Sequence, residues 1–304
     1  MTKKNSEIAL VTGGAGFIGS NLVDKLIEEN FKVVVIDNLS NGKKEYINPK
    51  AEFHKADIRE LKSIKKYFRN VDYVFHLAAQ PRIQPSIKDP LFSNDNNING
   101  ALNVLLAARD ARVKKFIYSA SSSAYGDQAK MPLKENMAIY PKNPYAAQKY
   151  FGEVYCRIFS ELYGLKTICL RYFNVYGPRQ KEEGAYSTVI AVFLRQKKKG
   201  RPMTIVGDGT KRRDFTYVSD VVGANILAAK SDLGKGEVIN IGTGKNFSVN
   251  QVAEMIGGKK INIPDRPGES KETLADISLA KKLLGWKPKV NLSEGIQKIL
   301  EYKE

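Results

Sequence analysis

The residues of this chain best suited to chemistry include a tyrosine and a lysine four positions apart, Tyr145 and Lys149. Asn143 is a good helix N-cap and Pro144 a good first helical residue, so we expect a helix that stops before Gly164. Tyr145 and Lys149 then share one helix face, where an ammonium group lowers the pKa of a phenol from about 10 toward neutrality. Such a phenol could take a hydroxyl proton while hydride leaves the same carbon. A chance pair on a helix surface is the alternative for this motif taken alone.

Three glycines follow the first apolar run in the spacing Gly13-x-x-Gly16-x-x-Gly19, and Asp37 ends the second apolar run. Glycines between a strand and a helix permit a tight turn and let the backbone approach a pyrophosphate at the helix N-terminus. A carboxylate at the position of Asp37 accepts hydrogen bonds from the adenosine ribose and repels a 2′-phosphate. The pattern therefore indicates NAD and disfavours NADP, with a structural glycine turn and a surface aspartate as the alternative.

A third polar cluster, Ser121-Ser122-Ser123, lies just past an expected strand at Phe116–Tyr118. In a doubly wound sheet, ligands gather outside the carboxyl ends of the strands. Serine hydroxyls there can donate to a sugar hydroxyl or to the oxygen of a forming carbonyl. A hydroxyl-rich turn that caps local backbone is the alternative.

The elements that must position these groups alternate along the chain, with apolar strand-like runs separated by amphipathic helix-like segments. This alternation predicts a parallel sheet covered on both faces. We expect an α/β Rossmann fold with a doubly wound parallel sheet and a smaller, mixed α/β C-terminal part. The NAD-binding domain is expected over 1–172, with segments returning around 210–245, and the substrate-binding part over 173–304. The expected strands are Ile8–Val11, Val33–Ile36, Val74–Leu77, Phe116–Tyr118, Ile168–Leu170 and Val238–Ile241.

The composition of the 304 residues is that of an ordinary globular protein, with 42% hydrophobic and 27% charged residues. The formal net charge of +17 is compatible with a nucleic-acid partner. The lysines are scattered, however, and the run Lys197–Lys199 precedes Gly200 as at a helix C-terminus. We therefore expect a solvated basic surface and no nucleic-acid partner.

No apolar run approaches the length that spans a bilayer, and we find no signal peptide. Cys156 and Cys169 stand among apolar residues, so buried thiols in a reducing compartment are expected. We expect a cytoplasmic protein with no membrane partner and no metal site.

Together these motifs resemble the extended short-chain dehydrogenase/reductase family, in its nucleotide-sugar branch of NAD-dependent epimerases and dehydratases. The resemblance covers nearly the whole chain and implies NAD as the cofactor and a nucleotide sugar as the substrate. It rests on Gly13–Gly19, Asp37-Asn38, Asp57-Ile58, His76-Leu-Ala-Ala79, Ser121–Gly126, Tyr145–Lys149, Arg171–Pro178, Gly207-Asp-Gly209, Arg213-Asp-Phe215 and Arg266-Pro-Gly-Glu269.

By position in these motifs, the resemblance implies the catalytic set Ser121, Tyr145 and Lys149. The residues that it implies for the cofactor are Gly13, Gly16, Phe17, Ile18, Gly19, Asp37, Asn38, Ser40, Asn41, Gly42, Lys43, Asp57, Ile58, Leu77, Ala78, Ala79, Asn96, Tyr145, Lys149 and Tyr172. Those that it implies for the substrate are Arg82, Ser121, Ser122, Ser123, Tyr145, Asn174, Ala185, Val189, Thr204, Val206, Arg213, Arg266, Glu269 and Thr273. Two guanidinium groups, Arg213 and Arg266, suit a diphosphate because each can form bidentate charge-assisted bonds.

The reaction that the resemblance implies begins with oxidation at C4 of the sugar, where Tyr145 takes the O4 proton and NAD takes the hydride. Dehydratases and decarboxylases of this branch carry a carboxylate just after the catalytic serine, whereas this chain has Ser122, Ser123 and Ala124. The absence of a carboxylate at these positions favours a 4-epimerase, in which the keto sugar rotates and hydride returns to the opposite face. A dehydratase, a decarboxylase, or a basic NAD-binding protein that holds nucleic acid is the alternative.

The choice of sugar depends on Thr273. In relatives restricted to UDP-glucose and UDP-galactose, a bulky tyrosine stands three residues before the aspartate matched here by Asp276. A small residue there implies room for an N-acetyl group at C2, and Ser121–Ser123 and Gly184-Ala185-Tyr186 resemble epimerases that prefer UDP-N-acetylhexosamines. The implied reaction interconverts UDP-GlcNAc and UDP-GalNAc, with UDP-glucose and UDP-galactose as a side activity. A UDP-glucose 4-epimerase proper is the alternative.

Two further expectations concern histidines and assembly. His54 and His76 are expected to be structural, because one lies within a strand and the other ends a strand beside the cofactor. In relatives, helices matching about Ser93–Arg109 and Asn143–Tyr163 form a bundle between subunits, so the resemblance implies a homodimer.

Overall fold

The computed structural model describes residues 6–180, 188–265 and 267–302. At its centre lies a seven-stranded parallel sheet, counted over these residues, in the order β11-β6-β5-β4-β1-β2-β3. The strands are β1 (Ile8–Thr12), β2 (Lys32–Asp37), β3 (Glu52–Lys55), β4 (Tyr73–His76), β5 (Lys115–Ser121), β6 (Thr167–Tyr172) and β11 (Lys235–Ile241). This confirms the predicted doubly wound α/β fold.

All six strands predicted with bounds are present, each within a few residues of those bounds. β3 had no predicted bounds, although His54 was expected to lie within a strand and does lie in β3. β3 is short, carries Glu52, His54 and Lys55 beside a single Phe53, and forms one edge of the sheet. An edge strand with such a polar composition gives no apolar run that would reveal it.

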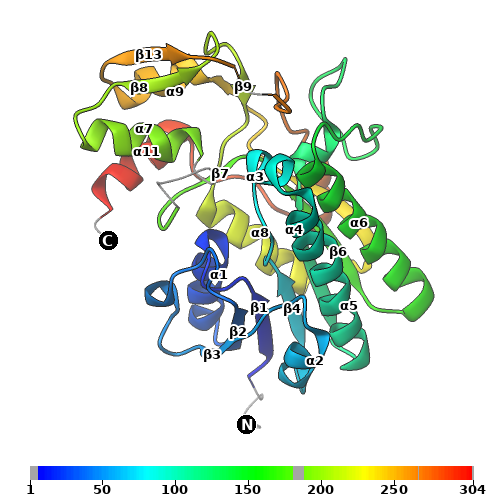
Figure 1. Cartoon of the computed structure of the whole chain (residues 1–304). Helices are drawn as coiled ribbons and strands as arrows, with labels where there is room; N and C mark the ends of the chain where they lie inside the picture. The colour runs from blue at the N-terminus through cyan, green and yellow to red at the C-terminus, as the bar shows by residue number, and fades with distance from the viewer. Residues whose placement is uncertain (1–5, 181–187, 266, 303–304) are drawn as a thin grey trace.

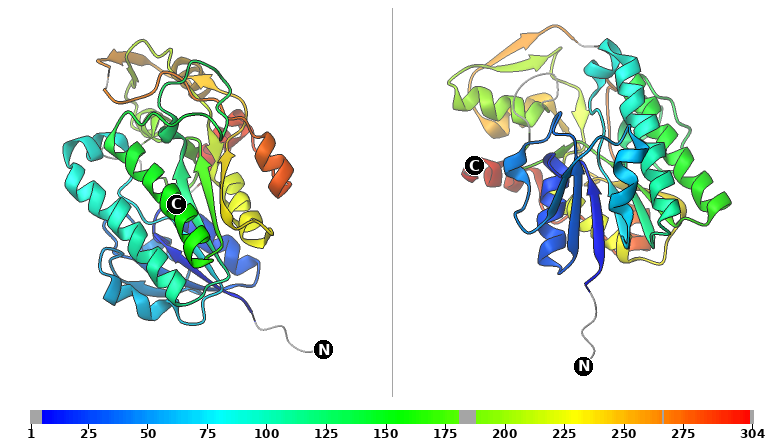
Figure 2. Two further views of the ribbon diagram at one scale, coloured as in Figure 1. Left: turned by 90° about the vertical axis from the view of Figure 1, so that its right-hand side faces the viewer. Right: turned by 60° about the horizontal axis from the view of Figure 1, so that its bottom comes forward.

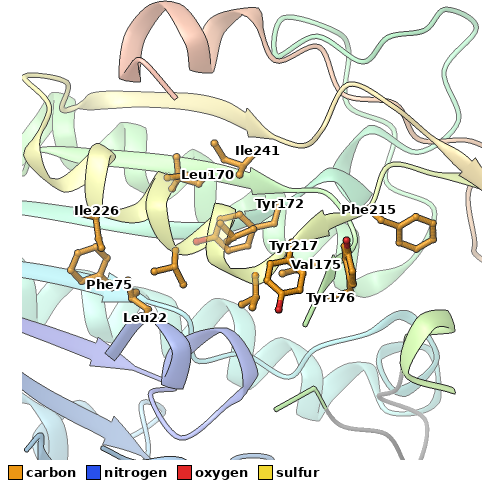
Figure 3. Close-up of a cluster of buried hydrophobic side chains, with 14 of the residues drawn as sticks. Leu22, Phe75, Leu170, Tyr172, Val175, Tyr176, Phe215, Tyr217, Ile226 and Ile241 are labelled. Carbon is orange, nitrogen blue, oxygen red and sulfur yellow. The ribbon is translucent and has the colours of Figure 1, made fainter. Parts of the chain in front are cut away.

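Two sets of helices cover the faces of the sheet (Figures 1 and 2). On one face, α1 (Phe17–Glu28) packs against α8 (Val218–Lys230). Figure 3 shows Leu22 of α1, Phe75 of β4 and Ile226 of α8 in the apolar cluster between them. The other face carries α2 (Leu61–Ile64), α5 (Gly100–Asp110) and α6 (Pro144–Tyr163).

The predicted boundaries of α6 are confirmed. The Asn143 side chain accepts a hydrogen bond from the Ala146 N–H (2.9 Å), and Gly164 ends the helix in the left-handed conformation. The helix expected from about Ser93 begins earlier, because Asp89 caps α4 (Pro90–Asn94) by accepting from the Phe92 N–H. A π-helical turn, Asp95–Asn99, joins α4 to α5.

A smaller region lies over the carboxyl ends of the sheet strands (Figure 1). In it, β8 (Met203–Val206) pairs in parallel with β13 (Lys260–Ile263), and α7 (Val189–Lys198) packs against α9 (Val249–Ile256). Its remaining elements are β7 (Val175–Tyr176), β9 (Arg212–Arg213), β10 (Thr216–Tyr217), β12 (Phe247–Ser248) and α11 (Leu292–Glu301). Between them in the chain, α10 (Ser278–Leu284) packs against β11 and α8. Because α8 and β11 belong to the central sheet layer, the chain crosses between the two regions more than once. The division into 1–172 and 173–304 stays a prediction.

Three smaller expectations can be compared with the structure. Cys156 and Cys169 are buried free thiols, as predicted. The run Lys197–Lys199 is exposed at the end of α7, and Gly200 follows it in the left-handed conformation. No helix in the described part of the chain is both long and apolar enough to span a membrane.

Candidate active site

The glycine turn after β1, called here the glycine cradle, is packed so closely that a side chain at Gly13 or Gly19 would overlap neighbouring backbone atoms. Gly13 has φ +74°, and a Cβ there would lie 2.7 Å from the backbone nitrogen of Ala78. A Cβ on Gly19 would lie 2.1 Å from the Gly13 carbonyl oxygen, so α1 packs directly on the turn. This close packing is the reason for glycine in a dinucleotide turn, and the N-terminus of α1 opens toward the same space. The residues present therefore fit the pyrophosphate of a dinucleotide.

Asp37 ends β2 beside this cradle. Its two carboxylate oxygens accept hydrogen bonds from the Ala15 N–H (3.0 Å) and the Leu39 N–H (2.8 Å). Burial raises the pKa of Asp37, and the two backbone hydrogen bonds oppose that rise. A carboxylate held in this way retains lone pairs for the hydroxyls of a ribose.

One cavity, of about 920 Å³, runs from the glycine cradle to the polar end of β5 and on to the C-terminal region. It is lined by every predicted site residue that the structure describes, except Asp57. The predicted substrate residues Ala185 and Arg266, with the neighbouring Gly184 and Tyr186, lie outside the described residues. The structure thus gathers residues from 13 to 273 around a single space.

The Asp57 carboxylate does not line the cavity, because it forms hydrogen bonds with neighbouring side chains. It accepts two hydrogen bonds from the Arg59 guanidinium (3.0 and 2.8 Å) and one from the Asn38 side chain (2.9 Å). Arg59 is the main reason that the pKa of Asp57 falls to about 2. Its neighbour Ile58 does line the cavity, and the cofactor role of Asp57 stays a prediction.

Tyr145 and Ser121 meet where α6 passes the end of β5. The Ser121 and Ser123 hydroxyls lie 2.8 Å apart, and Ser121 also forms a hydrogen bond with the Tyr145 phenol. Burial raises the pKa of Tyr145, while the positive charge of Arg82 and the Ser121 hydrogen bond act in the opposite direction. The phenol is therefore placed at the cavity wall with a hydrogen-bonding hydroxyl beside it.

Lys149 lines the same cavity as Tyr145, and the expectation that this lysine lowers the pKa of Tyr145 stays a prediction. Its ammonium lies 4.7 Å from the ring centre of Tyr118, and burial lowers its own pKa to about 8, an effect that Glu153 partly offsets.

The two histidines are held by other side chains. His76 Nδ1 lies 2.7 Å from Thr12 Oγ1, and burial together with Lys149 lowers the pKa of His76 to about 3. His54 stacks on Tyr67 and lies 2.8 Å from a carboxylate oxygen of Glu52. His76 is therefore neutral at any pH near 7 and carries no charge into the site.

The far end of the cavity is a wall of polar side chains from the C-terminal region. Asn174 donates to the Thr273 hydroxyl (3.2 Å) and to the Asp214 carbonyl (2.9 Å). Arg213 lies 3.6 Å from a Glu269 oxygen and donates to the carbonyl of Lys271 (3.2 Å), among others. Of the predicted substrate residues, Val189, Thr204 and Val206 complete this wall from α7 and β8.

Sequence reasoning missed several lining residues, among them Lys211, Arg179 and Phe215. Lys211 stands two positions before Arg213, and the two-residue period of extended backbone would have placed both on one face. Arg179 directly follows the Arg171–Pro178 motif. No sequence pattern predicted its positive φ of 64° or its ion pair with Asp24 (2.7 Å). Among the described lining residues, the carboxylates are Asp37 and Glu269.

Comparison with known proteins gives a consistent result. The sequence profile described as the NAD-dependent epimerase/dehydratase family matches residues 9–242. A putative UDP-glucose 4-epimerase of Methanocaldococcus jannaschii is 42% identical, over 96% of this chain and 97% of its own length.

Two solved structures extend this comparison. A UDP-glucose 4-epimerase of Thermotoga maritima with UDP-glucose superimposes with a TM-score of 0.94 at 42% identity, covering 97% of this chain and 98% of the other. A UDP-N-acetylglucosamine 4-epimerase of Methanobrevibacter ruminantium in complex with UDP-N-acetylmuramic acid gives 0.92 at 40% identity, covering 97% of each chain.

Proposed function

The chain belongs to the NAD-dependent epimerase/dehydratase family, and from that premise we propose that it is a 4-epimerase that interconverts UDP-GlcNAc and UDP-GalNAc. UDP-glucose and UDP-galactose are its secondary substrates. NAD is the cofactor, as the family description states, and the glycine cradle and Asp37 are the residues that would hold it.

The observation that carries the choice of sugar is the place of Thr273. This residue lines the cavity, and its hydroxyl accepts from the Asn174 amide and from the Asp214 N–H (3.3 Å). With those contacts behind it, a larger side chain at this position would extend into the cavity. The small threonine supports a cavity with room for an N-acetyl group.

The carboxylates around the cavity support epimerisation over dehydration. Elimination of water from a keto sugar needs an acid and a base near C5 and C6. The described lining carboxylates, Asp37 and Glu269, lie at the glycine cradle and against Arg213 respectively. Ser122, Ser123 and Ala124 supply no carboxylate beside Tyr145.

Each of the chain's own groups has a defined task in this reaction. Tyr145 takes the proton from the O4 hydroxyl, and Ser121 donates a hydrogen bond to the O4 oxygen as the carbonyl forms. Asn174 and Arg213 hold the nucleoside diphosphate while the 4-keto sugar turns over about its pyrophosphate link. NAD, when bound, supplies the site that accepts hydride from C4 and returns it to the other face. Tyr145 then gives its proton back to O4.

A UDP-glucose 4-epimerase proper is the second candidate, because both the Methanocaldococcus and the Thermotoga relatives, each 42% identical, carry that name. The two candidates share the chemistry and differ in the preferred sugar. Activity on the two substrate pairs, in the wild type and in a variant at Thr273, therefore distinguishes them.

The experiment compares Thr273→Tyr with the control Thr273→Ser on both substrate pairs, with products quantified by NMR. We expect Thr273→Tyr to reduce kcat/KM for UDP-GlcNAc by about 100-fold or more, because the ring fills the space of the acetyl group. UDP-glucose should lose about tenfold or less, and Thr273→Ser should retain both activities. Equal losses on the two substrates, or a wild-type enzyme inactive on UDP-GlcNAc, would refute the proposed substrate.

We also propose a homodimer formed through α4, α5 and α6. Large apolar side chains are exposed on α4 and α6, with Leu91 83% and Leu162 71% exposed, and exposed apolar surface of this kind is typical of subunit contacts. Light scattering should give twice the chain mass for the wild type and the chain mass for Leu162→Glu. A monomeric wild type would exclude the dimer.

A further inference from the structure

The segment Pro267–Lys271, called here the strap, forms part of the wall at the sugar end of the cavity. Glu269 and Ser270 of the strap line the cavity. At its end the strap joins the C-terminal region, because the Arg212 N–H of β9 donates to the Lys271 carbonyl (3.1 Å). The position of the strap therefore affects the space that is open to a ligand.

The first residues of the strap pack against α3 (Ile83–Lys88). Gly268 has φ +80°, and a Cβ added there would lie 3.2 Å from the Ile87 side chain. The Gln84 side-chain amide donates to the Pro267 carbonyl (3.0 Å). The strap thus spans the distance between the C-terminal region and the helices beside the catalytic residues.

Asn143 contacts the strap and the catalytic helix at the same time. Its side-chain oxygen accepts from the Ala146 N–H (2.9 Å) and caps α6, while its side-chain nitrogen donates to the Gly268 carbonyl (3.1 Å). The partners fix the orientation of the amide, because a backbone N–H requires an acceptor and a carbonyl requires a donor. Tyr145, the proposed base, lies in the first turn of the same helix. One half-buried side chain therefore connects that turn to the strap.

The residue type at position 143 matches this double task. Asparagine, aspartate and serine cap helices about equally well, so the cap alone does not require an amide. Of the three, asparagine is the one whose side chain offers an N–H donor in addition to the capping oxygen. The hydrogen bond to Gly268 therefore gives the amide a function that the cap does not.

Other side chains that hold the strap lie nearer to solvent. The Asp127 carboxylate accepts from the Lys271 N–H (3.0 Å) and from the Lys142 ammonium (2.5 Å), which also donates to the Glu269 carbonyl (3.4 Å). Asp127 and Lys142 are exposed, so solvent and salt weaken these contacts. Asn143 is half-buried, and its contact is expected to contribute more.

We propose that Asn143 is a positioning residue that holds the strap against the catalytic helix, so that the nucleotide sugar is retained between the strap and Tyr145. This inference rests on the proposed function, because it takes a UDP-sugar as the ligand of the cavity. In that reaction the 4-keto sugar must turn over without leaving the cavity. A strap fixed to the helix that carries the base restricts its escape.

The test compares the wild type with Asn143→Ser and Asn143→Asp, which keep a capping oxygen and lose the amide donor. In Asn143→Ser, KM for the UDP-sugar and Kd for UDP, measured by calorimetry, should rise about 3- to 10-fold, as expected for the loss of one hydrogen bond. Asn143→Asp should lose about tenfold or more, because its carboxylate would face the Gly268 carbonyl. The value of kcat and the affinity for NAD should stay as in the wild type.

Two further variants separate the contact with the strap from the helix cap. Asn291 caps α11 by accepting from the Glu294 N–H (2.9 Å) and does not line the cavity, so Asn291→Ser should leave KM and the UDP affinity unchanged. Asn143→Ala removes the cap together with the strap contact. It should weaken UDP binding as Asn143→Ser does and, in addition, lower the thermal unfolding midpoint.

A second readout needs neither ligand nor turnover. Hydrogen–deuterium exchange of the strap and of Thr273, whose N–H donates to the Arg212 carbonyl (3.1 Å), should be about threefold or more faster in Asn143→Ser than in the wild type. Exchange in α6 should not change, because serine retains the cap. If the wild type neither binds UDP nor converts UDP-sugars, the proposed function fails, and the exchange rates still decide whether Asn143 holds the strap.

Two results would overturn the inference. One is an Asn143→Ser variant with the KM, UDP affinity and strap exchange of the wild type. The other is a parallel fall of kcat, NAD affinity and thermal midpoint in this variant, which would show that Asn143 acts through the stability of the fold.

Discussion

The end of the cavity proposed for the cofactor is formed largely by backbone, and the end proposed for the sugar is formed by side chains. The glycine cradle offers N–H groups and close packing, and Asp37 is itself fixed by two backbone hydrogen bonds. At the sugar end, Ser121, Tyr145 and Arg82 come from β5, α6 and the start of α3. The first end is formed by the turn after β1 and the end of β2, whereas the second is assembled from separate elements.

This difference suggests how proteins of one fold can bind the same cofactor and act on different substrates. A change of backbone conformation in the cradle damages folding and cofactor binding together, because the turn packs against β1, β4 and α1. A change of side chain at the sugar end can alter the chemistry without loss of the fold. The following predictions test that contrast, from the largest expected effect to the smallest.

The largest effect is expected for Tyr145→Phe, which removes the proposed base and leaves the ring. We predict that kcat falls by about 10²- to 10⁴-fold, the usual contribution of general acid–base catalysis, while the thermal unfolding midpoint changes little. Tyr140→Phe, at a side chain that is 66% exposed, is the matched control and should behave as the wild type. Full activity of Tyr145→Phe would remove this residue from the mechanism.

At the cofactor end, Gly13→Ala should damage stability and NAD binding together. The new Cβ would lie 2.7 Å from the Ala78 nitrogen in a residue with φ +74°, so we expect a loss of about 3 kcal/mol in the free energy of unfolding. The matched control is Gly164→Ala, where φ is +68° and no atom lies within 4 Å of the new Cβ. It should lose only about 1 kcal/mol and keep NAD affinity. Urea unfolding and NAD titration measure both quantities, and equal behaviour of the two variants would contradict the role of close packing.

The smallest effect, and one of opposite sign, is expected for the stability of Lys149→Met. Burial lowers the pKa of Lys149 from 10.5 to about 8, so below pH 8 the folded state bears a charge that the unfolded chain carries more easily. The penalty, of up to about 3 kcal/mol, disappears as the pH rises from 8 to 10.5. We predict that Lys149→Met is more stable than the wild type at pH 7, by about 1–3 kcal/mol, although its activity is lost.

The control and the contrary result for this prediction are both measured by urea unfolding. The exposed Lys44→Met should be neutral, and the advantage of Lys149→Met should shrink by pH 10. A variant that is less stable than the wild type at pH 7 would show that Lys149 is a structural residue.

Much of the cofactor end could be predicted from the sequence, because backbone demands leave local signals. A positive φ at Gly13 and an apolar strand before Asp37 each restrict residue type within a short window. The strands of the central sheet could be predicted from their apolar runs for the same reason, and the polar edge strand β3 is the exception.

The sugar end was harder to predict from the sequence, because residues that are neighbours in space there are distant in the sequence. The contact of Asn174 with Thr273 spans 99 positions, and no local pattern encodes it. The pair Tyr145 and Lys149 was found by its spacing, but the spacing could not show that the Lys149 ammonium lies over the ring of Tyr118. Arg82 was named as a candidate substrate contact, but no local pattern predicted its positive φ of 85°.

The central claim is that hydride leaves C4 of the bound sugar and returns to the same carbon on the opposite face. Its most direct test is incubation of the wild-type enzyme and NAD with UDP-GlcNAc that carries deuterium at C4, followed by NMR of the products. We predict UDP-GalNAc with the deuterium retained at C4. Loss of the label to water, or a 4-keto-6-deoxy product, would contradict the account.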